Sequence, residues 1–213
     1  MTGEELIAEG RQLQRPSWFL RPEPLGEVAA IWHDCNEDEI ESTGHHCWIT
    51  IDARFVPGLP SSTIKFLRVL TNEDDCEGGK IEVSAENNRR EGIKLYAHPA
   101  NVIPPLDAVM LKGSDAVGQW LAAHKWQRDW GYNGNFQDEA AKAYNRVWFA
   151  EHPMYRESDI FAILGGWHFQ FPDSDWMNQL EDQHVILTLR DSEPWVEGWL
   201  TRNRDFKVFQ RIT

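Results

Sequence analysis

The chain has 213 residues, of which 41% are hydrophobic and 26% are charged, so it can bury a sizeable core and is not composed like a disordered chain. Its formal net charge of −13 argues against binding to nucleic-acid backbones or to anionic membranes, because both need a basic surface. The same charge favours a basic protein as partner.

The cysteine content and the N-terminal segment predict a cytoplasmic protein. Three cysteines, an odd number, do not suggest a disulfide scaffold. The N-terminal MTGEELIAEG is acidic and amphipathic, unlike a secretory signal. No apolar run approaches the roughly 20 residues of a membrane-spanning helix. We therefore expect a reducing compartment and no membrane contact.

The first hundred residues predict one helix followed by an antiparallel sheet. Thr2 and Glu5 have the spacing of a capping box, which starts a helix that we expect to run to Arg15, before Pro16. Ser17–Pro24 predicts an extended segment that docks on another element. Period-2 alternation and apolar runs bounded by turn residues predict strands at Val28–Cys35, His45–Phe55, Ile64–Leu70, Lys80–Ala85 and Ile93–Ala97. Two acidic loops, Glu37–Glu41 and Glu73–Glu77, are expected between strands.

The remaining residues predict a central helical pair and a C-terminal three-strand meander. Apolar residues at helical spacing indicate helices over Ser114–Trp126 and Asp138–Glu151, packed on the sheet. Pro104–Pro105 breaks the chain, and residues 100–115 are the one plausible boundary. We expect a single α+β domain over 1–213, compact or divided into two closely packed lobes. The meander strands are expected at His184–Leu189, Pro194–Leu200 and Phe206–Ile212.

The first candidate site is a metal centre on the hairpin formed by the strands around residues 33 and 47. His33 and Cys35 lie two apart on one strand, and His45 and Cys47 do so on the next. A register that pairs 33 with 47 and 35 with 45 would converge two imidazoles and two thiolates, which are ligands that zinc accepts. The alternatives are buried structural Cys and His side chains, a redox pair, or, in a shifted register, a disulfide between Cys35 and Cys47.

The second candidate site is a corner at Gly165–Gly166, where the glycines predict a sharp change of direction. The side chains beyond it offer imidazole, carboxylate and aromatic surfaces for ligand binding or for general acid–base chemistry. The residues are Trp167, His168, Asp173, Asp175, Trp195 and Glu197. The alternative is structural: an aromatic core strand that packs against the meander, followed by a capped helix start.

The chain contains none of the GxGxxG, GxxxxGK[ST], HExxH or GxSxG patterns, which disfavours nucleotide-driven and hydrolase-fold chemistry. Eleven tryptophans supply a core or a binding groove. Together with the acidic charge, these observations favour a non-enzymatic interaction protein. The alternative is a metal-dependent or carboxylate-based enzyme that uses one of the two candidate sites.

Overall fold

A computed structural model describes residues 1–33, 45–57, 59, 64–72, 75–85, 92–123, 138–151, 159–167, 184–189, 195–200 and 206–211. The chain divides into two compact units. The helical unit comprises Met1–Pro16, Asn101–Arg156 and Gly166–Asp182, and the sheet unit comprises Ser17–Ala100, Glu157–Gly165 and Gln183–Thr213. Within the described ranges, no helix is both long enough and apolar enough to cross a bilayer.

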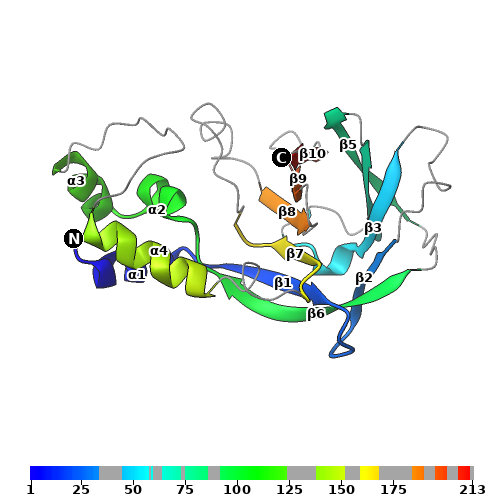
Figure 1. Cartoon of the computed structure of the whole chain (residues 1–213), viewed down its shortest axis with the longest axis horizontal. Coiled ribbons are helices and arrows are strands. Elements are labelled where there is room, and N and C mark those ends of the chain that lie inside the picture. Colours follow the sequence, from blue (N-terminus) through cyan, green and yellow to red (C-terminus); the bar gives the residue numbers. More distant parts are fainter. Residues whose placement is uncertain are drawn as a thin grey trace. The chain divides into compact units, whose positions relative to one another are not determined.

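The described part of the helical unit holds four α-helices (Figure 1). They are α1 Gly3–Gln12, α2 Leu106–Lys112, α3 Asp115–Ala123 and α4 Glu139–Glu151. The predicted capping box of α1 is confirmed: the Glu5 amide donates to Thr2 Oγ1 at 3.2 Å, and the Thr2 amide donates to Glu5 Oε2 at 2.7 Å. The expected end at Arg15 is wrong, because Arg15 already belongs to a strand. A residue that precedes proline avoids helical backbone angles, so the helix ends earlier than its apolar pattern suggests.

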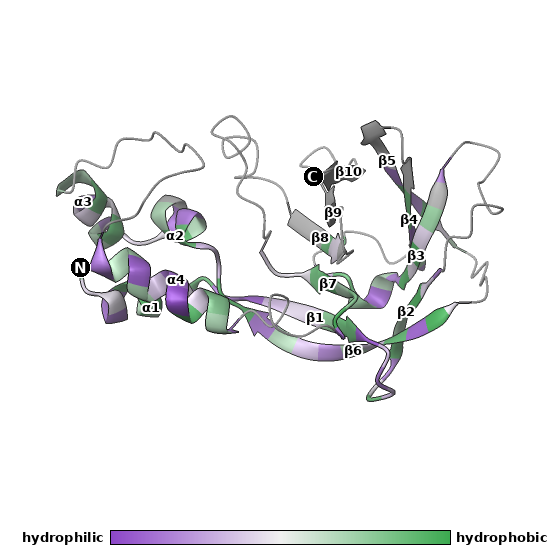
Figure 2. Cartoon of the chain, in the orientation of Figure 1, coloured by the Kyte–Doolittle hydropathy of each residue, from purple (hydrophilic) through white to green (hydrophobic). Residues whose placement is uncertain are grey.

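Helices α1 and α4 pack closely because two glycines of α1, Gly3 and Gly10, face side chains of α4. A Cβ atom on Gly3 would lie 2.7 Å from the Cβ of Ala143, and Gly10 meets the ring of Tyr144. Leu6, Ala141 and Tyr144 are fully buried. Polar and apolar residues alternate in bands along both helices (Figure 2), which is the pattern of helices with one buried face.

Helix α2 was not predicted, and it begins where we expected only a break. Pro105 is its N-cap, with φ −62° and ψ 157°. Proline is tolerated at a helix start because the first amides of a helix have no partner within it. Helix α4 matches its predicted range, and Asp138 caps it: its Oδ1 accepts from the amide of Ala140 at 2.8 Å. The predicted range 114–126 contains α3, and residues 124–126 lie outside the described residues.

The sheet unit is built on one antiparallel sheet in the strand order β10-β9-β8-β7-β1-β6-β2-β3-β4-β5. Strands β5 and β10 at the two ends also contact each other, so the sheet curls (Figure 1). The mixed helix-and-strand class with an antiparallel sheet agrees with the sequence prediction. The strands are β1 Arg15–Arg21, β2 Val28–Trp32, β3 His46–Asp52, β4 Phe66–Asn72, β5 Asp75–Ser84, β6 Ile93–Val102, β7 Ala162–Gly165, β8 His184–Leu189, β9 Trp195–Leu200 and β10 Phe206–Arg211.

Several strand boundaries differ from the prediction. β3 ends at Asp52, whose carboxylate caps a 3-10 turn over Ala53–Phe55 by accepting from the Arg54 amide at 3.0 Å. β5 begins at Asp75, so part of the expected acidic loop Glu73–Glu77 is strand. β6 continues through Pro99 to Val102. The first part of the extended segment predicted at Ser17–Pro24 belongs to β1, which ends at Arg21 and lies inside the sheet between β7 and β6.

The core of the sheet unit includes apolar side chains at directly paired positions of neighbouring strands. Ile49 and Ile51 of β3 are paired with Val69 and Leu67 of β4, and all four side chains are fully buried. β-Branched and leucine side chains in adjacent positions give each pair a close apolar contact. The same cluster includes Leu20, Ala30, Leu95, Ala162, Leu164 and Leu187.

Candidate functional site

The β2–β3 hairpin has a register shifted by one residue from the one that the predicted zinc site requires. Ile31 is opposite Thr50 and Trp32 is opposite Ile49. The His33 amide therefore donates to the Trp48 carbonyl, at 2.8 Å, and His33 is not opposite Cys47. A one-residue shift changes which side chains share a face of a sheet.

The side chains of the hairpin are placed as follows. His33 is buried, and its Nε2 lies 2.8 Å from Thr50 Oγ1. Cys47 is buried, with Sγ 4.0 Å from the Ile49 carbonyl oxygen, and His45 is half-buried. Cys35 lies outside the described residues. Among those that are described, no three His, Cys, Asp or Glu side chains are grouped as cation ligands would be. The zinc site with His33, Cys35, His45 and Cys47 stays a prediction.

The Gly165–Gly166 corner is confirmed as a turn of the backbone. The two glycines have φ of 72° and 79°, angles that side chains other than glycine rarely adopt. His168, Asp173 and Asp175 lie outside the described residues, as do Phe169 and Phe171. Trp195 and Glu197 are at register positions opposite Arg211 and Phe209. Carboxylate chemistry at this corner therefore also stays a prediction.

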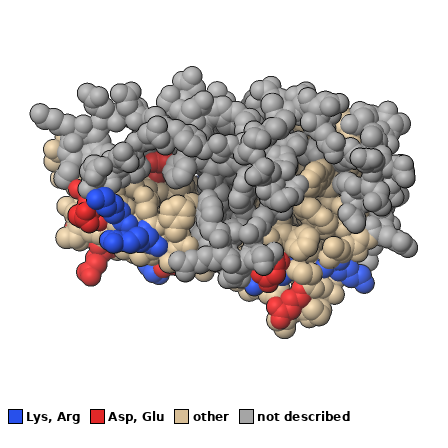
Figure 3. All heavy atoms as spheres, viewed as in Figure 1, with Lys and Arg blue, Asp and Glu red and all other residues tan. Residues whose placement is uncertain are grey.

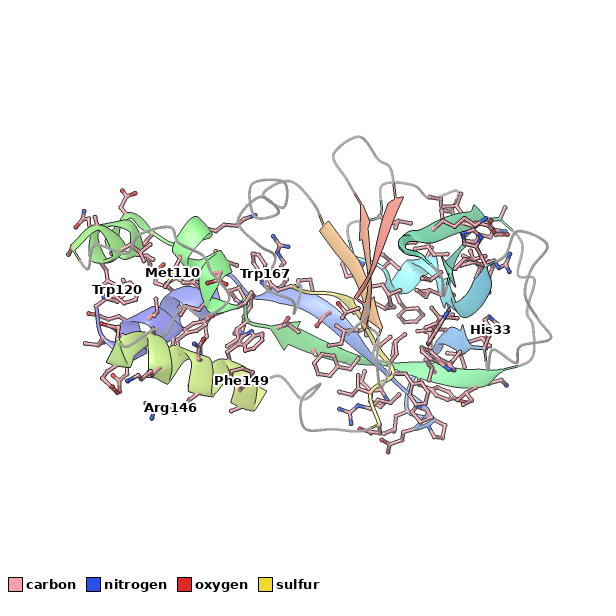
Figure 4. The ribbon with its side chains drawn as sticks, turned by 45° about the horizontal axis from the view of Figure 1, so that its top comes forward. His33, Met110, Trp120, Arg146, Phe149 and Trp167 are labelled. Carbon is pink, nitrogen blue, oxygen red and sulfur yellow. The ribbon has the colours of Figure 1, made fainter. Side chains whose placement is uncertain are left out.

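Trp167, the first residue after the corner, is the centre of a cationic cluster within the helical unit (Figure 4). The Arg15 guanidinium carbon lies 3.6 Å from the centroid of the Trp167 ring, and Lys112 Nζ lies 5.7 Å from it. The Trp167 indole Nε1 donates to the Leu13 carbonyl at 3.0 Å. Leu13 is the C-cap of α1, so the indole satisfies a carbonyl that a helix end leaves without a partner.

The arrangement holds the Arg15 side chain in place while it leaves the donors of the guanidinium unused. Arg15 is half-buried and burial lowers the pKa of its guanidinium, although an arginine stays charged. Within the described ranges, it has no carboxylate or carbonyl acceptor. A guanidinium carries five N–H donors in one plane. A fixed cation with unsatisfied donors is suited to an anionic ligand.

Asp107 in the first turn of α2 is the second chemically distinctive group of the helical unit. Asp107 is buried, with only 8% of the residue exposed. Among the described residues it has no hydrogen-bond or ion-pair partner. Burial raises the pKa of its carboxyl from the ordinary 3.8 to about 6. A carboxyl that titrates near neutral pH can both give and accept a proton.

Sequence reasoning identified Trp167 but missed Arg15, Lys112 and Asp107. Arg15 was interpreted as the last residue of a helix, and α2 was not expected at all. Asp107 and Lys112 lie in the segment that follows Pro104 and Pro105, which was interpreted as a break in the chain. An N-terminal proline at a helix start was the one signal that could have indicated α2.

In comparisons with known proteins, no family model, no curated protein and no solved structure matches this chain.

Proposed function

We propose that this chain is a non-enzymatic interaction protein that binds a basic protein partner through its acidic surface. The observation that supports the proposal is the excess of acidic side chains, 34 against 21 basic ones. Such an excess raises the rate of encounter with a positively charged surface.

Ion pairs within each unit strengthen this argument. Arg68 lies 3.3 Å from the Glu82 carboxylate, and Lys142 lies 2.9 Å from that of Glu139. Arg54 contacts both Glu27 and Asp52. Basic and acidic side chains lie next to each other on the described surface shown in Figure 3. Each of these three basic side chains is matched by at least one acidic one, so these pairs leave the excess of acidic over basic residues in the sequence in place.

The acidic segment at 37–41 is the element to test, because it concentrates four carboxylates in five residues. A variant with Glu37→Gln, Asp38→Asn, Glu39→Gln and Glu41→Gln is compared with a matched variant that neutralises four exposed acids elsewhere, Glu4, Glu23, Glu27 and Glu139. Calorimetric titration with a lysine- and arginine-rich peptide should show binding that weakens with salt. Binding should fall further in the first variant. Equal losses of affinity in the two variants would show that the peptide is attracted by the net charge of the chain and is not bound at residues 37–41.

A carboxylate-based enzyme is the second candidate, favoured by the burial of Asp107 and its pKa of about 6. A carboxyl ¹³C NMR titration, assigned with Asp107→Asn, tests this premise. A titration midpoint near the ordinary value of 3.8 would remove the support for this candidate.

A further inference from the structure

We propose that helix α2 is a pH-sensitive switch of the helical unit, which stays closed while the Asp107 carboxyl is protonated and opens locally when that carboxyl ionises. The inference goes beyond the proposed binding of a basic partner, because it assigns a conformational response to one helix and needs no ligand. It rests on the burial of α2, on the surroundings of Asp107, and on the contacts that hold the neighbouring helices together without α2.

Helix α2 is buried on all sides. Every residue from 102 to 110 is buried, and α2 contacts α1, α3 and α4 (Figure 1). The buried residues 106–110 at the start of α2 span more than one helical turn, so no face of this turn is open to solvent. Asp107 is the only charged residue in the buried stretch. Its carboxyl therefore reaches water only if α2 moves.

The surroundings of Asp107 do not compensate a negative charge. The cap of α2 at Pro105 has no side-chain hydrogen bond, so the carboxyl does not serve as an acceptor for the first amides of the helix. Within the described ranges, Asp107 has neither a hydrogen bond nor an ion pair. Burial raises the pKa of the carboxyl to about 6 and is the one cause of the shift. An unpaired carboxylate is costly to keep in a protein interior, so ionisation favours a state in which the group is hydrated.

The charged side chains of the helices around α2 are engaged elsewhere or do not act on Asp107. Glu9 of α1 accepts from the amide and the hydroxyl of Ser114 at 3.1 and 2.7 Å, and Arg11 pairs with Glu151 of α4. The other charged or titratable residues of the four helices and their caps are Glu4, Glu5, Lys112, Asp115, Asp138, Glu139, Lys142, Tyr144 and Arg146. None of these groups contributes to the pKa shift of Asp107.

The helices around α2 are held by contacts in which α2 takes no part. Gly3 of α1 lies against Ala143 of α4, and Gly10 lies against Tyr144. Helix α2 has only seven residues, too few for a helix that is stable without packing. The Tyr144 hydroxyl holds the chain just before α2, because it donates to the Pro104 carbonyl at 2.7 Å. Opening after this point is therefore local, and local opening costs less than global unfolding.

The direction of the switch follows from the proton. The closed state binds the proton more tightly than an open state in which the carboxyl is hydrated, so opening becomes more frequent as the pH rises from about 4 to about 6. Opening also exposes apolar side chains of α2, such as Leu106 and Val109, which are buried in the closed state. Neutral pH thus exposes a surface that acidic pH keeps buried.

The test is amide hydrogen exchange of the full chain, followed by NMR and expressed relative to the unfolded chain at the same pH. The amides of Val109 and Gly113 report on α2, since they donate to the carbonyls of Pro105 and Val109 at 3.3 and 2.7 Å. We expect their protection to fall more than about tenfold between pH ~4.5 and pH ~7.5, as a pKa of about 6 against an ordinary 3.8 allows. Protection of the α4 amides should change much less.

Two substitutions separate the carboxyl from other effects of pH. Asp107→Asn should make the protection of α2 independent of pH, whereas Asp115→Asn, at an exposed aspartate in the first turn of α3, should behave as the wild type does. Circular dichroism shows which variants are folded, and Asp107→Ala replaces Asp107→Asn if the latter is not.

Three results would overturn the proposal. The protection of α2 in the wild type does not depend on pH, or a folded Asp107 variant keeps the dependence, or α4 loses protection by the same factor as α2. The last result would show that the unit opens as a whole and that α2 is not a separate switch. None of these results affects the basic-peptide titration, which probes residues 37–41 at one pH.

Discussion

Gly10 of α1 lies directly against Tyr144 of α4, so that a Cβ atom at position 10 would be 2.6 Å from Cε2 and 2.8 Å from Cζ of the tyrosine ring. Tyr144 is fully buried, and its hydroxyl donates to the Pro104 carbonyl at 2.7 Å. The ring therefore cannot move aside without losing its hydrogen bond. This contact sets how closely α1 and α4 approach each other.

Gly10→Ala is expected to destabilise the chain by about 1–3 kcal/mol, because an added methyl group overpacks a well-filled contact. Gly118→Ala is the matched control. Gly118 is also inside a helix, but nothing lies within 4 Å of a Cβ atom there. Alanine at that position should stabilise the chain by about 0.5–1 kcal/mol through helix propensity. Urea unfolding measures both changes, and the same sign for the two variants would contradict the packing argument.

Tyr144→Phe is expected to cost about 1–3 kcal/mol, because it leaves the Pro104 carbonyl without its donor. Burial raises the pKa of the Tyr144 phenol, so the hydroxyl stays protonated and donates throughout the neutral range. Combined with Gly10→Ala, the loss should be smaller than the sum of the single losses, since the hydroxyl is among the atoms that the new methyl group meets. A double-mutant cycle measures this coupling, and strict additivity would show that the two residues do not compete for space.

Asp107→Asn is expected to stabilise the chain at neutral pH. The carboxyl has a pKa of about 6 in the folded chain against an ordinary 3.8, so the folded state holds the proton more tightly than the unfolded state. Stability therefore falls as pH rises from about 4 to about 6, and the penalty is complete above that window. Asp107→Asn should remove this penalty and so raise the free energy of unfolding by at most about 3 kcal/mol at neutral pH. Below pH ~4 the gain should be small, because the carboxyl is then protonated in the folded chain.

Asp115→Asn, at an exposed aspartate in the first turn of α3, is the control for the Asp107 experiment. Chemical denaturation at several pH values compares the two variants with the wild type. A gain for Asp107→Asn that does not depend on pH would show that the carboxyl is not the source of the penalty.

Thr2→Ala is expected to destabilise α1 by about 1 kcal/mol, because it removes the side-chain acceptor of the Glu5 amide. Thr2→Ser retains the hydroxyl and should retain most of the stability. Amide hydrogen exchange in the first turn of α1 reports the change locally. Equal protection in the alanine and serine variants would mean that the capping box contributes nothing measurable.

The amino-acid sequence by itself determined the features that depend on neighbours along the chain. The capping box at Thr2 and Glu5, the range of α4 and the turn at Gly165–Gly166 were all predicted, because caps, helical periodicity and glycine angles are local properties. The strand regions followed from alternation, whereas their boundaries did not, since pairing decides where a strand stops.

Only the tertiary structure decided the chemistry of the helical unit. Arg15 and Trp167 are separated by most of the chain, and no local pattern indicates that one stacks on the other. The β2–β3 register depends on packing of both strands, and a shift by one residue changed what faces His33. Asp107 has an ordinary carboxyl in the sequence, and its raised pKa comes from burial that its neighbours in space impose.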